Sequence, residues 1–341
     1  MIPHSRPYFD EHFSSAVQQM ISSCHTAMGE QSKALEMQLA QRTQQVGAAA
    51  VDSGTSALML ALRALQQSHT IQHVGIPAYA CASLWFAVRA ANCEPVLMDC
   101  DNDLRLNADL ARQQAAHLDA MILVHPFGMV EPLVAEAWPC PVIEDIAQAA
   151  GATLHNQPVG SFGDLSIASF YSTKPWGGAY GGMVMGNPAI CDIIRSMRNP
   201  DQANLTLPYA GHHQLSNMHA ALALTRLKRA TKEAKSRLQH FQWLDSHLPK
   251  RFKESINNRQ YGNSFRYIIR TDGDAETTLH KLHQHGIGAA KPVQHPLQHP
   301  HQTAPTGAAK AWRDCISLPV LTHLSSHEYA CYAEGLKQCF D

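Results

Sequence analysis

Short apolar runs alternate with longer amphipathic segments through the first 190 residues or so. Seven of these runs are almost wholly apolar, as strands buried on both faces of a sheet require. They are residues 48–52, 74–79, 95–99, 120–125, 141–145, 165–171 and 181–186. Helix-like segments such as SALMLALRAL and CASLWFAVRAA lie between them. This alternation predicts the α/β class, with a mainly parallel sheet of seven strands flanked by helices.

The rest of the chain has other patterns. Spaced apolar positions in residues 11–45 predict one or two helices before the first strand, and residues 216–245 predict one long connecting helix. Beyond it, residues 265–270 have the pattern of a strand, whereas 275–285 and 326–339 have that of helices. The end of the chain is therefore predicted to form a smaller α+β unit.

Length and composition narrow the class of protein. A chain of 341 residues is long for one core, so we expect a large domain over residues 1–235 and a small one over 236–341. With 45% hydrophobic and 16% charged residues, the chain can bury such cores, and disorder is not expected. A net charge of −1 without a basic stripe argues against nucleic-acid binding.

Two further patterns bear on location. The most apolar stretch, ALMLALRAL, is short and interrupted by Arg63, so we expect no segment that spans a membrane. Nine scattered cysteines without a CxxC spacing are typical of free thiols in a reducing compartment. Because the first residues also lack a signal pattern, we expect a cytoplasmic protein.

Histidines are concentrated near the C-terminal end. Imidazole is a common metal ligand, so a metal site there is one interpretation. The other is a polar, proline-rich loop in a chain with 21 histidines, and we favour it because no convincing helix face pairs two of them beside a glutamate. No metal is therefore expected. The residues are His280, His283, His285, His295, His299 and His301.

Three polar clusters follow apolar runs, where open α/β sheets place their ligands. The first is SGTSA at residues 53–57. Gly54 allows close backbone approach, the start of the following helix attracts an anion, and the hydroxyls of Thr55 and Ser56 can add hydrogen bonds. A phosphate would suit this cluster, although an ordinary helix cap has the same sequence.

The second cluster is VIEDIAQAAG at residues 142–151. Asp145 ends an apolar run, so its carboxylate would be largely removed from water and would need a cationic or hydrogen-bonding partner. Gln148 follows three residues later. A helix cap at Asp145 explains the same residues equally well.

The third cluster is SFYSTKPWGG, which contains Lys174 among apolar and small residues. Burial disfavours the charged form of a lysine, and a neutral lysine captures aldehydes as a Schiff base. Ser169, at the start of the stretch, could help to bind a phosphate. A solvated loop lysine is the ordinary alternative. Pyridoxal 5′-phosphate unites the three clusters, since it carries a phosphate, a ring nitrogen that must stay protonated and an aldehyde.

At this point the chain resembles the DegT-type sugar aminotransferases (perosamine-synthetase-like), which are fold type I pyridoxal-phosphate enzymes. The resemblance covers nearly the whole chain. It includes RPYFDEHF, VDSGTSALMLAL, VIEDIAQAAGA, SFYSTK, YGGMV, HGIGAAKPVQHPL and SLPVLTHLSSHE.

The resemblance implies a role for each matching position. Lys174 would bind the cofactor aldehyde, Asp145 would pair with the ring nitrogen, and Gln148 would lie near the phenolic oxygen. Thr55, Ser56 and Ser169 would hold the phosphate, beside Gly54. Cys81 stands where relatives often have an aromatic residue against the ring, so a softer contact is expected there.

Relatives are typically homodimers with shared active sites. A contact from the neighbouring subunit to the phosphate would come from His212, where relatives often have asparagine, and Gln214 stands in place of an arginine. Ala179 and Tyr180 also depart from the glycine-rich stretch that often follows the lysine. Because of these differences, the resemblance does not fix what the second subunit contributes to the site.

The resemblance implies transfer of an amino group from an amino acid, with glutamate expected, to a keto-sugar that is nucleotide-linked. The product would serve amino-sugar, polysaccharide or secondary-metabolite synthesis. Two alternatives remain: a ketone without a nucleotide, or a degenerate member that binds cofactor or sugar without turnover. A nicotinamide-dependent dehydrogenase is disfavoured, because no G-x-G-x-x-G follows the first strand.

Overall fold

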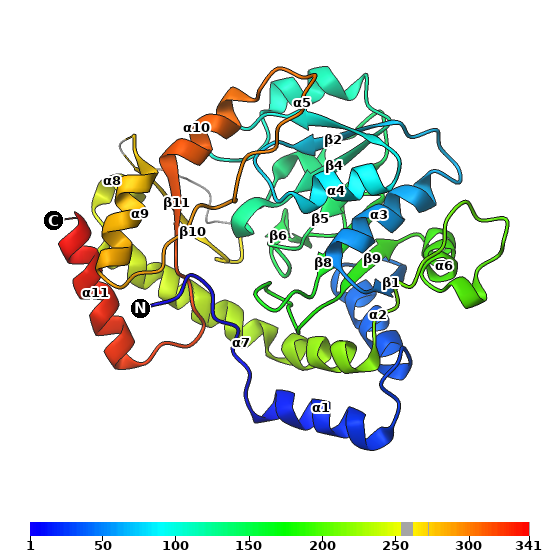
Figure 1. Cartoon of the computed structure of the whole chain (residues 1–341), viewed down its shortest axis with the longest axis horizontal. Helices are drawn as coiled ribbons and strands as arrows, with labels where there is room; N and C mark the ends of the chain where they lie inside the picture. The colour runs from blue at the N-terminus through cyan, green and yellow to red at the C-terminus, as the bar shows by residue number, and fades with distance from the viewer. Residues whose placement is uncertain (254–261, 272, 341) are drawn as a thin grey trace.

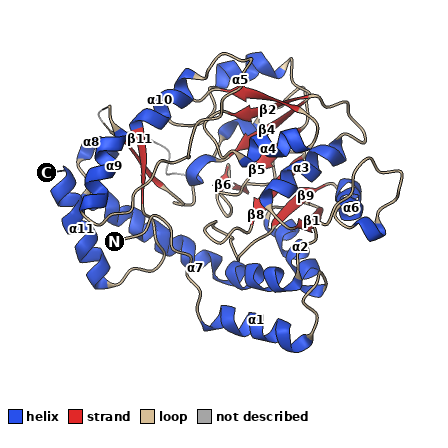
Figure 2. Cartoon of the chain, in the orientation of Figure 1, coloured by secondary structure: helices blue, strands red, loops and turns tan. Residues whose placement is uncertain are grey.

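The computed structural model describes residues 1–253, 262–271 and 273–340, and a seven-stranded sheet lies at its centre (Figures 1 and 2). The strand order is β1-β9-β8-β5-β4-β2-β3. Only β9 runs antiparallel to its neighbours in this sheet. The strands are β1 (Gly47–Val51), β2 (His73–Pro77), β3 (Glu94–Met98), β4 (Ala120–Val124), β5 (Val142–Asp145), β8 (Leu165–Ser169) and β9 (Gly182–Gly186). Each predicted apolar run forms one of these strands, so the predicted mainly parallel sheet is confirmed.

Helices cover both faces of the sheet because successive side chains of each strand point to opposite faces. Ala49 and Val51 of β1 pack with one helix layer, whereas Ala48 and Ala50 pack with the other. The first layer contains α3 (Gly54–Leu65), α4 (Ser83–Ala90) and α6 (Pro188–Met197). The second contains α2 (Glu30–Arg42), α5 (Ala108–Ala115) and the first half of α7 (Asn217–His247). Outside the layers lie α1 (Glu11–Ser23), the short hairpin β6 (Thr153–Leu154) with β7 (Gln157–Pro158), and the 3₁₀ turns Pro126–Gly128, Pro132–Ala135 and Pro200–Gln202.

The C-terminal region has a separate core. Strand β10 (Tyr267–Arg270) pairs antiparallel with β11 (Cys315–Leu318). Around them lie α8 (Lys250–Lys253), α9 (Ala275–Gln284), α10 (Thr306–Asp314) and α11 (Ser326–Phe340). Ile2 belongs to this core as well, because its backbone pairs with Gly286 and Gly288. The first residues of the chain therefore lie beside the C-terminal region in space.

Helix α7 joins the two cores. Its first half is buried against the large sheet, and Phe241 and Leu244 are buried in the C-terminal core. The predicted domain boundary at 235/236 falls inside this continuous helix. A single 31-residue helix thus fixes one core relative to the other.

Other expectations concern metals, thiols and membranes. In the described parts of the chain, no group of three or more histidine, cysteine or acidic side chains could hold a metal ion. The C-terminal histidines differ in their contacts: for example, His299 contacts Glu94, whereas His283 contacts the carbonyl of Ala289. All nine cysteines are free. Within the same described residues, no helix is long and apolar enough to cross a membrane.

Candidate active site

Strands β1, β5 and β8 end at the same edge of the sheet, and each is followed there by one of the polar clusters. The cluster after β1 starts α3, and Asp145 and Ser169 are the last residues of β5 and β8. Lys174 follows in the loop after β8. The structure therefore brings together residues that are far apart in the sequence, as the carboxyl edge of an open α/β sheet predicts.

The start of α3 has the features of an anion site. Ser53 caps the helix by accepting the N–H of Ser56 at 3.1 Å, which leaves the N–H groups of Gly54 and Thr55 outside the ladder of the helix. A Cβ at Gly54 would lie 3.0 Å from the Cβ of Ser169 and 3.2 Å from its Oγ. Glycine thus allows the Ser169 hydroxyl to approach the helix start. The helix cap and the features of an anion site coexist here.

Sequence reasoning missed a histidine beside this cradle. Residues 213 and 214 pair with the end of β1, and His213 Nδ1 lies 3.2 Å from the carboxylate of Asp52. Tyr209 contacts the other ring nitrogen at 2.6 Å. Burial alone would raise the pKa of Asp52. Hydrogen bonds from His213 and Ser56 nevertheless hold this pKa below its ordinary value. His212, the expected contact from a second subunit, is exposed.

Two adjacent carboxylates on β5 differ in their partners. Glu144 is fully buried and accepts hydrogen bonds from His125 and from the backbone N–H groups of Gly160, Phe162 and Gly163. Burial raises its pKa, but these bonds outweigh burial and hold the pKa below its ordinary value. Such a saturated carboxylate fixes the 160–163 loop and has no capacity left for a ligand.

Asp145 has far fewer partners, although it is only 6% exposed. Its Oδ1 accepts the N–H of Ala147 at 2.8 Å, so it caps a turn and not a helix. Burial raises the pKa of Asp145, and the Ala147 hydrogen bond and the nearby charge of Lys174 oppose this shift only in part. A cationic ring nitrogen would supply the missing partner and keep the carboxylate ionised.

The loop that carries Lys174 is tightly turned. Lys174 N–H donates to the carbonyl of Tyr171, and Gly177 N–H donates to that of Lys174, both at 2.8 Å. A Cβ at Gly177 would lie 2.1 Å from the carbonyl oxygen of Tyr171, so only glycine fits. Arg226 of α7 also donates to the carbonyl of Gly177 at 2.8 Å. The position of the lysine is therefore fixed from both sides.

Burial lowers the pKa of Lys174, and the neighbouring Asp145 carboxylate opposes this shift. The Nζ atom lies 5.7 Å from the centre of the Phe265 ring. An apolar neighbour and little water favour the neutral amine, which is the nucleophilic form. The solvated loop lysine that the sequence left open does not describe this residue.

Lys174 is one of the residues that line a cavity of about 500 Å³. Gln148 and Cys81 line it, together with Trp85, Phe86 and residues 292–298. The Oε1 of Gln148 accepts the N–H of Phe127 at 2.9 Å, which leaves its amide NH₂ to donate. The cavity is large enough for a cofactor and part of a substrate.

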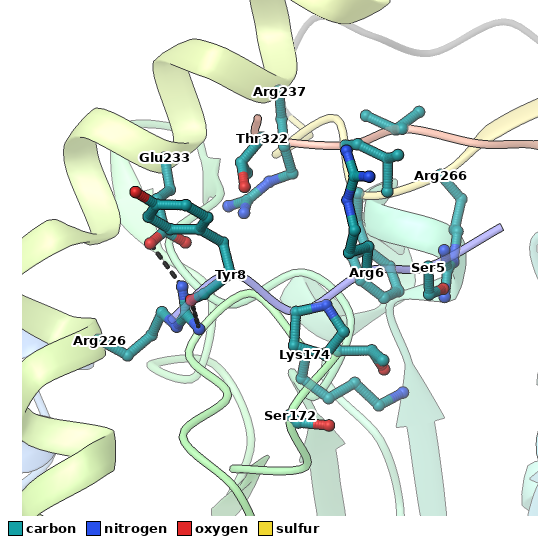
Figure 3. A pocket seen from close by; sticks show the side chains of 15 residues that line it. Ser5, Arg6, Tyr8, Ser172, Lys174, Arg226, Glu233, Arg237, Arg266 and Thr322 are labelled. Atoms are coloured by element: carbon teal, nitrogen blue, oxygen red, sulfur yellow. Dashed lines mark hydrogen bonds and ion pairs between the residues drawn. The ribbon is translucent and has the colours of Figure 1, made fainter. Parts of the chain in front are cut away.

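A second, smaller cavity shares part of its lining with the first and was not predicted. Lys174, Phe265 and Arg266 line both cavities. Figure 3 shows side chains from the N-terminal segment, the lysine loop and α7 around the smaller one. One signal in the sequence was available: Arg226, Glu233 and Arg237 recur at helical spacing on the face of α7 that should be apolar.

These residues fit pyridoxal phosphate. The cradle at Gly54 suits its phosphate, the under-partnered carboxylate of Asp145 suits its ring nitrogen, and the buried amine of Lys174 suits its aldehyde. The role of each residue stays a prediction, since the fit rests on geometry and on the chemistry of the groups.

Comparisons with known proteins agree with this geometry. Among curated relatives, a UDP-N-acetyl-3-dehydro-alpha-D-glucosamine 3-aminotransferase of Acidithiobacillus ferrooxidans is 34% identical over 206 residues, which are 58% of this chain and 55% of the relative. A GDP-perosamine synthase of Caulobacter vibrioides is 30% identical over 215 residues, 59% of this chain and 57% of the relative. The chain thus spans little more than half the length of these curated relatives in the matched regions.

Solved structures share the fold over almost the whole chain. The PLP form of a putative sugar aminotransferase, Spr1654 of Streptococcus pneumoniae, covers 99% of this chain and 98% of its own, with a TM-score of 0.86 and 22% identity. PseC of Helicobacter pylori, an aminotransferase of pseudoaminic acid biosynthesis, covers 99% of both chains, with a TM-score of 0.88 and 19% identity.

A profile of the DegT/DnrJ/EryC1/StrS aminotransferase family matches residues 7–336. This range includes the helix start after β1, Asp145 and Lys174, as well as most of the C-terminal region. The chain therefore belongs to the DegT/DnrJ/EryC1/StrS aminotransferase family.

Proposed function

We propose that this protein is a pyridoxal-phosphate-dependent aminotransferase that moves an amino group from an amino acid, glutamate in particular, to a nucleotide-linked keto-sugar. The observation that carries the proposal is the pair of the half-buried Lys174 and the buried Asp145 at the sheet edge, where Lys174 borders a cavity of about 500 Å³. Family membership supports the reaction class, and the names of the curated relatives support a sugar nucleotide.

Pyridoxal phosphate, when bound, supplies an aldehyde that takes up the amino group and a ring that withdraws electrons from the reacting carbon. Lys174 Nζ holds and moves the proton, as a base and then as an acid, and its lowered pKa suits both roles. Asp145 holds a proton on the ring nitrogen by its negative charge. The Gln148 amide N–H would be free to donate to the cofactor, and the start of α3, with Thr55, Ser56 and Ser169, would hold the phosphate.

The second subunit belongs to the proposal as well. Tyr171 and Tyr180 are 46% and 58% exposed beside the lysine loop and pack edge to face against each other. Exposed aromatic side chains next to a site are typical of an interface. We therefore expect a homodimer that covers them, with His212 as a candidate contact to the phosphate of the other subunit. The nine free thiols support a cytoplasmic location.

The test uses cofactor-loaded protein, glutamate and a panel of acceptors. UDP-, GDP- and dTDP-linked keto-sugars are compared with free keto-sugars and keto acids, and 2-oxoglutarate release is measured. The proposal predicts that at least one nucleotide-linked ketone is aminated far faster than its free counterpart. Equal rates with free ketones would favour the alternative acceptor class. If glutamate leaves the cofactor spectrum unchanged, the degenerate, binding-only member is favoured.

A further inference from the structure

The smaller cavity beside Lys174 is strongly cationic. Its charged lining consists of five cationic side chains and one carboxylate, that of Glu233 (Figure 3). The cationic side chains are Arg6, Lys174, Arg226, Arg237 and Arg266. Because buried charges in folded proteins are paired, the important question is which of these cations already has a partner.

Two of the arginines have carboxylate partners. Arg6 pairs with Glu328 at 2.7 Å, on the outer side of the cavity. Arg226 pairs with Glu233 and also donates to the carbonyl of Tyr8, so it ties the N-terminal segment to α7. Glu233 further lies 3.6 Å from Arg229. Among the described residues that line the cavity, the one carboxylate is therefore already engaged.

Arg237 is different. It is only 7% exposed, and no hydrogen bond or ion pair joins its guanidinium to any residue that the structure describes. Burial lowers its pKa to about 10, with Glu233 opposing the shift, so the group stays charged at neutral pH. Its neighbour Arg266 donates to the carbonyl of His4 at 3.3 Å and packs on the Phe265 ring. Neither arginine has a carboxylate partner among the described residues.

Size and position indicate what could complete this site. The cavity of about 50 Å³ has room for a few waters or a carboxylate with a short chain, but not for a nucleoside diphosphate. Its lining includes Lys174 and Arg237 of α7, and its hydroxyl-bearing residues are Ser5, Tyr8, Ser172, Thr173 and Thr322. An amino donor must place its reacting carbon at Lys174, so a second anionic group of the same donor can extend into this cavity.

We propose that the arginine-lined cavity binds the side-chain carboxylate of a dicarboxylic amino donor, with Arg237 as its cationic partner. The inference rests on the proposed aminotransferase function and adds to it the residue that selects a dicarboxylic donor. Guanidinium and carboxylate groups match in a bidentate geometry, and the pair would neutralise a charge that the protein alone leaves buried. Arg237 is then a specificity residue for the donor.

The first experiment uses the unaltered, cofactor-loaded protein. Calorimetric titration compares glutarate with glutaramate, its monoamide, which is nearly identical in shape but carries one negative charge less. Glutarate should bind about 10- to 100-fold more tightly, as one charge-assisted pair implies. Equal affinities would overturn the proposal whether or not any variant folds.

The second experiment removes the charge. In Arg237→Gln, the advantage of glutarate over glutaramate should disappear, and so should the preference for glutamate over glutamine in the donor half-reaction, read from the cofactor spectrum. Arg237→Lys should retain part of both. The matched control is Lys235→Gln, which removes an exposed charge from the same helix and should preserve the preference. An unchanged preference in Arg237→Gln contradicts the proposal.

Loss of the aminotransferase function and loss of the donor site give different results. If no amino acid changes the cofactor spectrum of the unaltered protein, the proposed aminotransferase function fails, while glutarate binding still reports on the cavity. If glutamate does change the spectrum but the Arg237→Gln protein discriminates as well as the unaltered one, the function stands and the donor site is wrong.

Discussion

Two buried arginine clusters in this protein differ in their charge balance. Near the end of α6, Arg198 is 4% exposed and bonds to the carboxylate of Glu36 at 2.7 Å. Glu36 also accepts the N–H of Ala50 at 2.8 Å, so the pair joins α2 to β1. At the smaller cavity, Arg237 is buried to a similar degree and has no such partner among the described residues.

The difference distinguishes buried charges that hold the fold together from buried charges that are available to a ligand. A cation with a fixed carboxylate partner holds two elements together, and removing one partner leaves a costly unpaired charge. A buried cation that the fold leaves unpaired has a partner to gain from outside the chain. The same contrast separates Glu144 from Asp145 on β5, since Glu144 is saturated by hydrogen bonds and Asp145 is not.

The largest effect is expected for Lys174→Ala. Lys174 lines the smaller cavity together with Arg237, which is unpaired among the described residues. Turnover should fall by at least about 10⁴-fold, because both the attachment point and the proton carrier are lost. The thermal midpoint should stay the same or rise, since a buried amine is removed. Half-reaction rates and a melting curve measure the two quantities. A large loss of stability would place Lys174 among the structural residues instead.

Asp145→Asn should come next. Asparagine can keep the hydrogen bond from Ala147 but cannot hold a proton on the ring nitrogen, so the half-reaction should slow by about 10²–10³-fold. The pKa of Asp145 is raised in the fold, so this group opposes folding more as pH rises above its unfolded pKa. The variant should therefore be more stable than the parent at pH 8, as urea titration would measure. Full activity in this variant would remove Asp145 from the mechanism.

Glu36→Gln tests the other cluster, in which Arg198 has a carboxylate partner. Removing this carboxylate leaves Arg198 buried and unpaired, so the free energy of unfolding should fall by about 3–5 kcal/mol. The affinity for glutarate should not change in the folded fraction. Urea titration and calorimetry measure the two effects, and Arg237→Gln should show the reverse combination. The comparison breaks down if both variants lose stability to the same extent.

The smallest effect concerns His4, which contacts Arg266 of the smaller cavity. Burial, and then the charge of Arg266, lower its pKa to about 3. Because the unfolded value is higher, near 6.5, the unfolded chain binds the proton first, and stability is lost as pH falls below that value. His4→Gln should recover about 1–2 kcal/mol at pH 5 and almost nothing at pH 7. Equal effects of the variant at both pH values would show that His4 does not sense this charge.

Much of the fold follows from local pattern. The seven central strands are predicted because parallel strands covered on both faces must be apolar along their whole length, as AMILV of β4 is. The three polar clusters are predicted because each follows such a strand. Local sequence also identifies Gly54, whose missing side chain allows Ser169 to approach the helix start.

Long-range packing could not be predicted in the same way. The smaller cavity is built from residues 5–8, the lysine loop, α7 and residues 320–322, which meet only in the folded chain. Ile2 joins the C-terminal core through backbone pairing that no periodicity reveals. His213, and not its neighbour His212, reaches Asp52 beside the anion cradle because the strand-like pairing of Gln214 with Val51 sets which side chain faces inward.

The central claim is that the Lys174 amine carries the cofactor, and reductive trapping tests it most directly. Protein loaded with pyridoxal phosphate is treated with borohydride, digested and analysed by mass spectrometry of its peptides. The account predicts one pyridoxyl group per chain on the peptide that contains Lys174, and none on that peptide in the Lys174→Ala protein. A label on another lysine, or no label at all, would contradict it.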